Sequence, residues 1–339
     1  MKTFMRILSL TMACILMLTL AACGTKADSS KNGDGTEAPT EKVEEVKWPT
    51  KDVTILTTVK AGGNMDIKAR LVAKYLAEEL GVNVIVENAP GGGGITGMTQ
   101  YLAEKPNTHT LIYMGVPHLT TAPFFNEVEY SADDISILCG LDTVENGLFV
   151  STESGITSLE QLLELGKDGK IIKFGSAGVN NDTFLFTKVL FQMAGVQSDS
   201  VDAGSSAESL VNCMAGTVDV AYCAMNLAKS YVESGDMLPI GVFSEEEYTG
   251  YEGITVPTFK SMGYDVVYAA TSFFAIRSGT DQAILDKLST ALDNVCNNPD
   301  FQKEFADAGY HMMEDRSLES VNNAVQELLK DLEGYRELF

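Results

Sequence analysis

The sequence predicts an α/β protein built on mostly parallel β-sheets. From Asp52 onward, short β-like runs alternate with amphipathic helical segments, the pattern of βαβ units. In such sheets, ligands bind at the carboxyl ends of strands, where loops lead into helix N-termini. Two of these junctions are rich in glycine and small polar residues and lie about 115 residues apart, so they could belong to two lobes.

Each expected element follows from hydrophobic periodicity and from the residues that end it. The expected strands are Val53–Thr58, Val82–Glu87, Thr110–Met114, Leu148–Ser151, Ile171–Gly175, Val218–Ala224, Pro239–Ser244 and Ser272–Ile276. The expected helices are Asp66–Leu80, Ile95–Leu102, Ser158–Leu165, Thr183–Ala194, Ser206–Met214, Asp281–Val295, Pro299–Ala308 and Ser317–Leu332. Thr157 and Glu160 have the spacing of a capping box that would open the third helix.

The N-terminus indicates export. Lys2 and Arg6 precede the apolar run Ile7–Leu20, and Leu20-Ala21-Ala22-Cys23 follows. Small residues before a cysteine are typical of bacterial lipoproteins, so residues 1–22 are expected to be a signal peptide and Cys23 the lipidated N-terminus. An ordinary signal peptide or a membrane helix are the alternatives, but about fourteen apolar residues are short for a span. We expect an extracytoplasmic protein, anchored to the outer face of the bacterial membrane, with residues 23–47 as a disordered linker.

Composition excludes several function classes. The chain has 339 residues, 45% of them hydrophobic, and a formal net charge of −23, which argues against nucleic acid and against charge-based binding to an anionic membrane. An anionic ligand would receive no long-range steering, so its site must use local dipoles. A monomer without cofactor is expected.

No residue pattern indicates a metal site. Isolated histidines at 109, 118 and 311 lack ligand spacing and are expected to be structural or surface residues. The cysteines of the folded part show no C-x-x-C pair and are expected to be buried free thiols, although a disulfide between positions 213 and 223 stays open. These cysteines are Cys139, Cys213, Cys223 and Cys296.

The first candidate loop runs from Thr57 to Asp66, between a strand and a helix. Its glycines let the backbone approach a ligand, and the helix N-terminus that follows suits a carboxylate. The alternative is a tight turn capped by Asn64 or Asp66. The candidate ligand-binding residues are Lys60, Ala61, Gly62, Gly63, Asn64 and Asp66.

The second candidate is a run of four glycines, Gly91–Gly94. It spells G-x-G-x-x-G with Gly97, the dinucleotide fingerprint. A dinucleotide site is not expected, because the stretch 109–119 holds no acidic residue and the chain is exported. We expect Gly92 and Gly93 to form a backbone wall of a ligand site.

The third candidate loop is Gly175–Thr183, again between a strand and a helix. Neutral donors near a helix N-terminus can hold a carboxylate without a full positive charge; capping by Asn181 or Asp182 is the alternative, and both can hold together. The candidate residues are Ser176, Ala177, Asn180, Asn181 and Thr183. Because no G-x-S-x-G elbow is present and Ser176 has no visible base, we do not expect an enzyme.

In series, these loops resemble the Bug-type solute-binding receptors of tripartite tricarboxylate transporters. Residues 61–70 match A-G-G-x-x-D-x-x-A-R, residues 86–94 match V-E-N-x-P-G-x-G-G, and F-G-S-x-G follows at 174–178. The resemblance implies a periplasmic-binding-protein type II-like fold with two α/β lobes joined by crossing hinge strands. One lobe would comprise residues 48–150 plus 271–339, and the other residues 151–270.

The resemblance also implies a function. The protein would hold a small carboxylate between the first loop and the Gly175–Thr183 loop and deliver it to a membrane permease. It departs from the family at Asp202–Ser205, where a basic residue is usual; Lys60 could offset that charge or face solvent, and Ser205 joins the candidate residues. The ligand could therefore be a di- or tricarboxylate or amino-acid-like. A receptor that presents its ligand to a membrane sensor is the alternative, and a secreted hydrolase a distant third.

Overall fold

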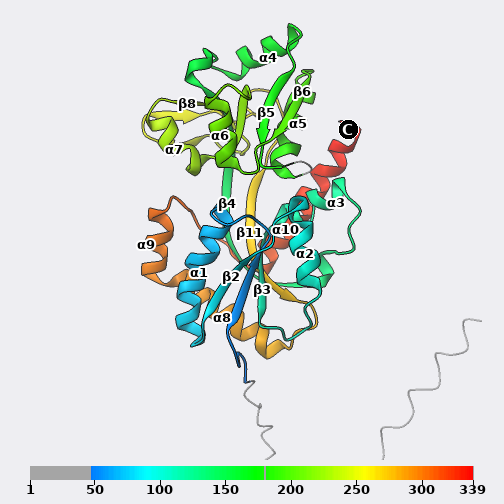
Figure 1. The fold of residues 1–339 in the computed structure, drawn as a ribbon, viewed down its shortest axis with the longest axis vertical. Helices are drawn as coiled ribbons and strands as arrows, with labels where there is room; N and C mark the ends of the chain where they lie inside the picture. Colours follow the sequence, from blue (N-terminus) through cyan, green and yellow to red (C-terminus); the bar gives the residue numbers. More distant parts are fainter. Residues whose placement is uncertain (1–46, 179–180, 339) are drawn as a thin grey trace, which may run out of the picture. The chain divides into compact units, whose positions relative to one another are not determined.

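The computed structural model describes residues 47–178 and 181–338, which belong to one compact unit, Val46–Phe339. Nine strands form one sheet in the order β2-β1-β3-β11-β4-β7-β5-β6, with β8 paired to β4 (Figure 1). Strands β2, β1 and β3 form one end of this sheet and β7, β5 and β6 the other, and each end packs against its own helices (Figure 1). The expected α/β fold with two lobes is therefore confirmed. Within the described residues, no helix has the length and apolarity needed to cross a membrane.

Lobe 1 contains a parallel group of three strands. β1 (Val53–Thr57) lies between β2 (Val84–Asn88) and β3 (Thr110–Gly115), and both pair with it in parallel. The helices of this lobe are α1 (Asn64–Leu80), α2 (Ile95–Leu102), α3 (Thr121–Phe125), α8 (Gln282–Asn297), α9 (Pro299–Asp307) and α10 (Leu318–Tyr335). The carboxyl ends of β1, β2 and β3 lead into the first candidate loop, the glycine run and a 3-10 turn, η2 (Val116–His118).

Lobe 2 repeats this arrangement. β5 (Ile172–Ser176) pairs in parallel with β6 (Ser198–Asp202) and β7 (Val220–Ala224). The helices of this lobe are α4 (Leu159–Lys167), α5 (Asp182–Met193), α6 (Ser206–Met214) and α7 (Met225–Glu233). Strand β8 (Met237–Val242) joins the sheet, and β9 (Tyr248–Tyr251) and β10 (Ile254–Val256) form a separate hairpin.

Two strands cross between the lobes, as Figure 1 shows. β4 (Ile135–Ser151) is 17 residues long; its first part pairs with β11 (Ala269–Arg277) and its last part with β7 and β8. The pairing of β4 with β11 shifts register between Ser272 and Phe273 and again between Phe274 and Ala275. Such irregularities bend and twist a strand pair, here in the part of β11 that also pairs with β3 in lobe 1.

The core is continuous through the junction of the lobes. One cluster of buried apolar side chains runs from Tyr101 and Met114 in lobe 1 to Phe174 and Phe186 in lobe 2. Phe186 stacks on Tyr268 with ring centroids 4.0 Å apart, and Phe125 of α3 meets Phe184 of α5 at 5.7 Å. Two further clusters lie in lobe 1 and lobe 2 respectively. Cys139, Cys213, Cys223 and Cys296 are buried free thiols.

Most expected elements are present, and the differences have local causes. The expected strand Leu148–Ser151 is only the end of β4, because Asp142, Glu145 and Asn146 interrupt the apolar pattern of a strand that is buried by neighbours far along the chain. The expected capping box is wrong by one residue: Ser158 Oγ accepts the Gln161 N–H at 3.3 Å. Strands β6, β9 and β10 and helices α3 and α7 were not expected from the pattern.

Candidate ligand-binding site

The first candidate loop ends in a helix N-terminus that no side chain caps. The N-cap of α1 is Gly63, which has no side chain, and only from Ile67 onward do the helix amides find carbonyl partners within the helix. The first amides of a helix point outward and carry a partial positive charge. The Asn64 side-chain oxygen is buried without a hydrogen-bond partner among the described residues. This end of α1 has the geometry of an anion site.

Asp66 holds the same loop in place rather than capping the helix. Its side chain is buried and accepts three donors: the Gly62 N–H at 2.8 Å, Arg70 Nε at 3.0 Å and Asn88 Nδ2 at 2.9 Å. Asn88 Nδ2 also donates to the Val59 carbonyl at 3.1 Å. Burial raises the pKa of Asp66, but the hydrogen bonds from Arg70, Gly62 and Asn88 outweigh it, and the pKa lies below its ordinary value of 3.8. The charged carboxylate of Asp66 therefore holds the Gly62 backbone, Arg70 and Asn88 together.

The glycine run packs against the end of β3. It forms a 3-10 turn, η1 (Gly92–Gly94), in which Gly92, Gly93 and Gly94 all have positive φ. A Cβ at Gly94 would lie 1.8 Å from the ring of His118, so only glycine fits there. The positive φ values of Gly92 and Gly93 likewise favour glycine. Conformation and packing explain the run without a dinucleotide.

The loop of lobe 2 is organised by its own small polar side chains. Ser176 is fully buried and its hydroxyl donates to the Gly178 carbonyl at 2.7 Å. The Ala177 N–H donates to Thr183 Oγ1 at 2.9 Å, and that hydroxyl donates to Asn181 Oδ1 at 2.8 Å. Asn181 is the N-cap of α5 and accepts the Phe184 N–H at 3.0 Å. The capping alternative therefore holds for Asn181.

Asp182, the first residue of α5, differs from the neutral donors beside it. Its carboxylate accepts the Tyr268 hydroxyl at 3.0 Å, and Tyr268 belongs to the segment that enters β11. Burial raises the pKa of Asp182 above 3.8, although Tyr268 and backbone amides pull it down in part. The buried hydroxyl of Tyr222 on β7 has no partner among the described residues.

Lys60 reaches from lobe 1 to the β6–α6 turn of lobe 2. A Cβ at Gly204 would lie 2.9 Å from both Lys60 Nζ and Glu208 Oε2, so the ammonium and the carboxylate are at most about 6 Å apart. Ser205 caps α6 by accepting the Glu208 N–H at 3.2 Å. The Lys60 ammonium thus lies beside the turn 202–205, where this chain has Asp202 and lacks the basic residue that is usual in the family.

The structure therefore groups the predicted residues in three sets. Gly62, Gly63, Asn64 and Asp66 lie together with exposed Ala61 at the start of α1; Lys60 is close to Gly204 and Ser205; and Ser176, Ala177, Asn181 and Thr183 surround the start of α5. Gly92 and Gly93 lie in η1. Among the described residues, no hydrogen bond or ion pair joins residues 61–66 to residues 176–183. Asn180 and Cys23 lie outside the described residues.

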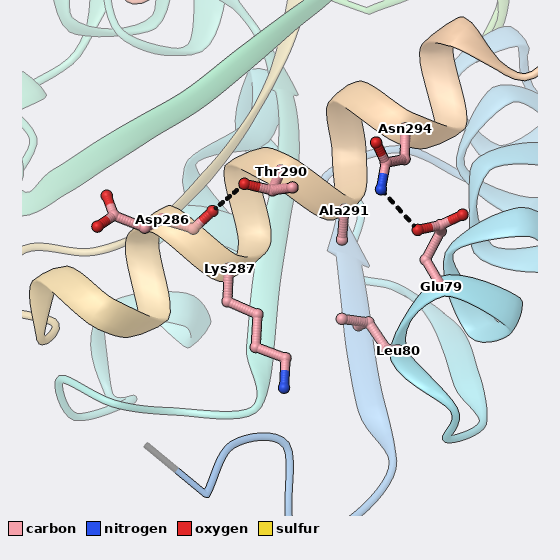
Figure 2. Close-up of a pocket in the computed structure, with 7 residues that line it drawn as sticks. All are labelled: Glu79, Leu80, Asp286, Lys287, Thr290, Ala291 and Asn294. Carbon is pink, nitrogen blue, oxygen red and sulfur yellow. Dashed lines mark hydrogen bonds between the residues drawn. The ribbon is translucent and has the colours of Figure 1, made fainter. Parts of the chain in front are cut away.

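Two surface pockets occur away from these loops. Figure 2 shows the first, between the end of α1 and α8, lined by Glu79, Leu80, Asp286, Lys287, Thr290, Ala291 and Asn294. At 1.5 Å per residue, Leu80 lies about 24 Å along α1 from Asn64, so this pocket is remote from the candidate loops. The second surrounds Lys51 and residues 103–109, at the amino end of β3. The part of the chain that the structure describes holds no cluster of three or more metal-ligating side chains.

Four residues that support the site were not singled out from the sequence. Asn88, Arg70 and Thr58 hold the first loop through side chains whose partners are distant in sequence. His118 was expected to be an isolated structural or surface residue. One signal was available: His118 follows β3 as the other loops follow their strands, at the edge where ligand loops gather.

This chain shares its fold with solved periplasmic binding proteins. BugD, a periplasmic binding protein, superposes with a TM-score of 0.75 at 20% identity over 86% of this chain and 98% of that one. MatC from Rhodopseudomonas palustris, solved with malate, gives 0.76 at 21% identity over 85% and 99%. An R. palustris protein solved with adipate gives 0.76 at 20% identity over 86% and 98%.

Sequence comparison gives the family. The profile of the Tripartite tricarboxylate transporter family receptors (TctC) matches residues 68–332, and the chain belongs to this family of substrate-binding receptors, which are not enzymes. It is 26% identical over 268 residues to a UPF0065 protein of Cupriavidus necator, covering 77% of this chain and 79% of that one. It is 22% identical to BugT of Bordetella pertussis over 269 residues, covering 77% and 81%. The predicted family is confirmed.

Proposed function

We propose that this protein captures a small carboxylate between its lobes and delivers it to a tripartite-type membrane permease. Lobe 1 comprises residues 48–150 and 271–339 in this proposal, and lobe 2 residues 151–270. The ligand is a di- or tricarboxylate or an amino-acid-like acid, the chemical class to which the malate and adipate of the neighbouring structures belong. Residues 1–22 are a signal peptide, and Cys23 carries the lipid that keeps the receptor near its permease.

The uncapped N-terminus of α1 carries this proposal. Four helices open at the candidate loops, and two of them have a side-chain cap: α5 by Asn181 and α6 by Ser205. α2 starts at Gly94, but its Ile95 and Thr96 amides donate to carbonyls of the glycine run. α1 starts at Gly63 with no side-chain acceptor. In a chain with a net charge of −23, an anion must be held by such local dipoles and by nearby cations. Lys60 lies beside this loop and reaches lobe 2, so an anion held at α1 would lie within reach of both lobes. A ligand that contacts both lobes favours their closure.

A capping substitution tests the proposal. Gly63→Asp places a carboxylate at the N-cap of α1, where φ is −78° and the backbone conformation is open to any residue; the new Cβ would lie 3.3 Å from the Lys60 carbonyl oxygen, so the loop must shift by a few tenths of an ångström. The new side chain should accept the free amides, stabilise the helix by a few tenths of a kcal/mol relative to glycine and occupy the anion site. Calorimetric titration with malate, adipate and citrate should then show binding to the wild type and at least a tenfold weaker affinity in Gly63→Asp, while the unfolding temperature rises or stays constant.

The matched control is Ser158→Asp, which introduces the same carboxylate at the N-cap of α4, outside the candidate loops. It should leave the affinity unchanged. Equal binding by Gly63→Asp and the wild type would overturn the α1 site. Lipidation is tested separately, by mass spectrometry of the N-terminal peptide from membranes and by release of a Cys23→Ser variant into the soluble fraction.

A further inference from the structure

His118 contacts three segments that converge at the candidate site of lobe 1. Its Nε2 lies 2.9 Å from Thr58 Oγ1, at the start of the first loop. Its Nδ1 lies 2.9 Å from the Gly115 amide nitrogen, at the end of β3. Its ring fills the space that a Cβ at Gly94 would occupy, at the end of the glycine run. One imidazole therefore fixes the relative positions of the ends of β1 and β3 and of the start of α2.

Thr58 transmits this contact to the first loop. The side chain is 3% exposed, and its two ends are held separately. Thr58 Oγ1 meets His118, whereas its Cγ2 lies against α2, at 2.8 Å from the position of a Cβ on Gly97. The chain from Val59 to Gly63 starts from this fixed point and is held at its far end by Asp66. A shift of Thr58 would move the loop backbone that precedes α1.

The imidazole is neutral at pH 7. Burial lowers the pKa of His118 below 6.5, more than the Gly115 contact raises it. Nδ1 lies 2.9 Å from both the amide nitrogen and the carbonyl oxygen of Gly115, so either neutral tautomer finds a partner there, and Nε2 and the Thr58 hydroxyl can form their hydrogen bond in either direction. No charged side chain is hydrogen-bonded to the ring among the described residues. His118 therefore supplies packing and hydrogen bonds to Thr58 and Gly115, not charge.

We propose that His118 is the positioning residue of the lobe 1 site, holding the first loop and the glycine run in the arrangement that binds the ligand. This inference rests on the proposed function for its ligand, but its structural content can be measured without one. It acts through Thr58 and Gly94 and is not itself a ligand contact.

Paired substitutions separate the two nitrogens of the ring. Glutamine places an amide donor near the position of Nε2 and can still bond Thr58, whereas asparagine reaches only the position of Nδ1 and Gly115. Hydrogen–deuterium exchange of the ligand-free protein reports on the loops, because the Gly62 and Gly63 amides and the Thr96 amide are hydrogen-bonded. We expect His118→Asn to speed exchange in residues 59–66 and 91–97 about tenfold, and His118→Gln to stay near the wild-type rate.

Three further measurements fix the interpretation. Thr58→Val removes the partner hydroxyl without touching the histidine and should behave as His118→Asn does. His311→Gln alters an exposed histidine and should change nothing. Exchange in α6 of lobe 2 should stay constant in every variant, because a general loss of stability would raise it too. Loops that exchange normally in His118→Asn, an equal rise in α6, or no recovery in His118→Gln would each overturn the inference.

Ligand titration then separates this inference from the proposed function. Where the wild type binds malate or adipate, His118→Asn should weaken that affinity about tenfold and His118→Gln should restore it; a loosened loop with normal affinity would overturn the positioning role. If the wild type binds none of malate, adipate and citrate, the carboxylate proposal fails, while the exchange experiment still decides whether His118 positions the loops.

Discussion

The candidate loops of lobe 1 and lobe 2 are held in opposite ways. The first loop of lobe 1 depends on partners far along the chain: Asp66 binds Asn88, and Thr58 binds His118. The Gly175–Thr183 loop of lobe 2 depends on neighbours within a few residues, through Ser176, Thr183 and Asn181. The comparison teaches that the candidate loop of lobe 1 is fixed by tertiary structure and that of lobe 2 by local sequence.

The two aspartates at these loops show the same contrast. Asp66 is buried among donors that stabilise its charge, and its pKa is lowered. Asp182 receives the Tyr268 hydroxyl and backbone amides, but desolvation by burial outweighs them, so its pKa is raised. Substitutions in lobe 1 should therefore have long-range effects, whereas those in lobe 2 should be small and local.

The largest effect on stability is expected from the ion pair between Lys68 of α1, the helix that follows the first loop, and Asp142 of β4. The two side chains are buried and their charged atoms lie 2.6 Å apart. Asp142 also accepts the hydroxyl of Ser272 on β11, so the pair joins the helix of the first loop to the crossing strands. Asp142→Leu would leave a buried ammonium unpaired, and should lower the free energy of unfolding by about 3–5 kcal/mol in urea denaturation.

The double variant sharpens this prediction. Lys68→Met together with Asp142→Leu removes both charges, and most of the lost stability should return, because a buried ion pair is worth little against well-packed apolar side chains. A double variant as unstable as Asp142→Leu would mean that Asp142 acts through Ser272 and Tyr113 rather than through the lysine. If the double variant recovers its stability but binds carboxylates more weakly than the wild type, the ion pair positions α1 for ligand binding.

A smaller loss is expected at Asp66. Asp66→Asn keeps the shape but removes the charge that three donors stabilise, and should lower the free energy of unfolding by about 2 kcal/mol at pH 7. Urea denaturation measures this. Asp300→Asn, at an exposed acid in the first turn of α9, is the matched control and should stay within about 0.5 kcal/mol of the wild type. Equal losses of unfolding free energy in Asp66→Asn and Asp300→Asn would contradict the structural role of the Asp66 charge.

The sequence was most informative where structure is local. The strand-to-helix junctions, the helix Ile95–Leu102 and the role of Asn181 as a cap follow from periodicity and side-chain chemistry within a few residues. The family resemblance added the arrangement of two lobes joined by crossing strands. The third loop could therefore be predicted nearly as it is, apart from residues 179 and 180, which lie outside the described part.

The first loop could be located from sequence but its supports could not. Asp66 was expected as a ligand residue or a cap, and nothing nearby indicates that Asn88, 22 residues on, donates to it. His118 meets Thr58 across 60 residues, a contact set by the packing of β3 beside β1. The full length of β4 was missed for the same reason, since polar residues in a crossing strand are satisfied by tertiary partners.

The smallest effect, and the sharpest form of the comparison, is a difference in pH dependence between the two aspartates. The lowered pKa of Asp66 means that its stabilisation is present above pH 3.8 and lost as the pH falls through the folded value. The raised pKa of Asp182 means that the folded state holds a proton more tightly than the unfolded chain, so its contribution declines as the pH rises from 3.8 to the folded value. Asp182→Asn should therefore gain stability relative to the wild type across that window, by about 1 kcal/mol or less at pH 7. Asp66→Asn should lose stability relative to the wild type as the pH rises to 3.8, and the difference should stay constant above it. Urea denaturation from about pH 2 to 7 should therefore show a pH-dependent difference below 3.8 for Asp66→Asn and above 3.8, with the opposite sign, for Asp182→Asn; differences of the same sign would mean that tertiary donors do not distinguish the two loops.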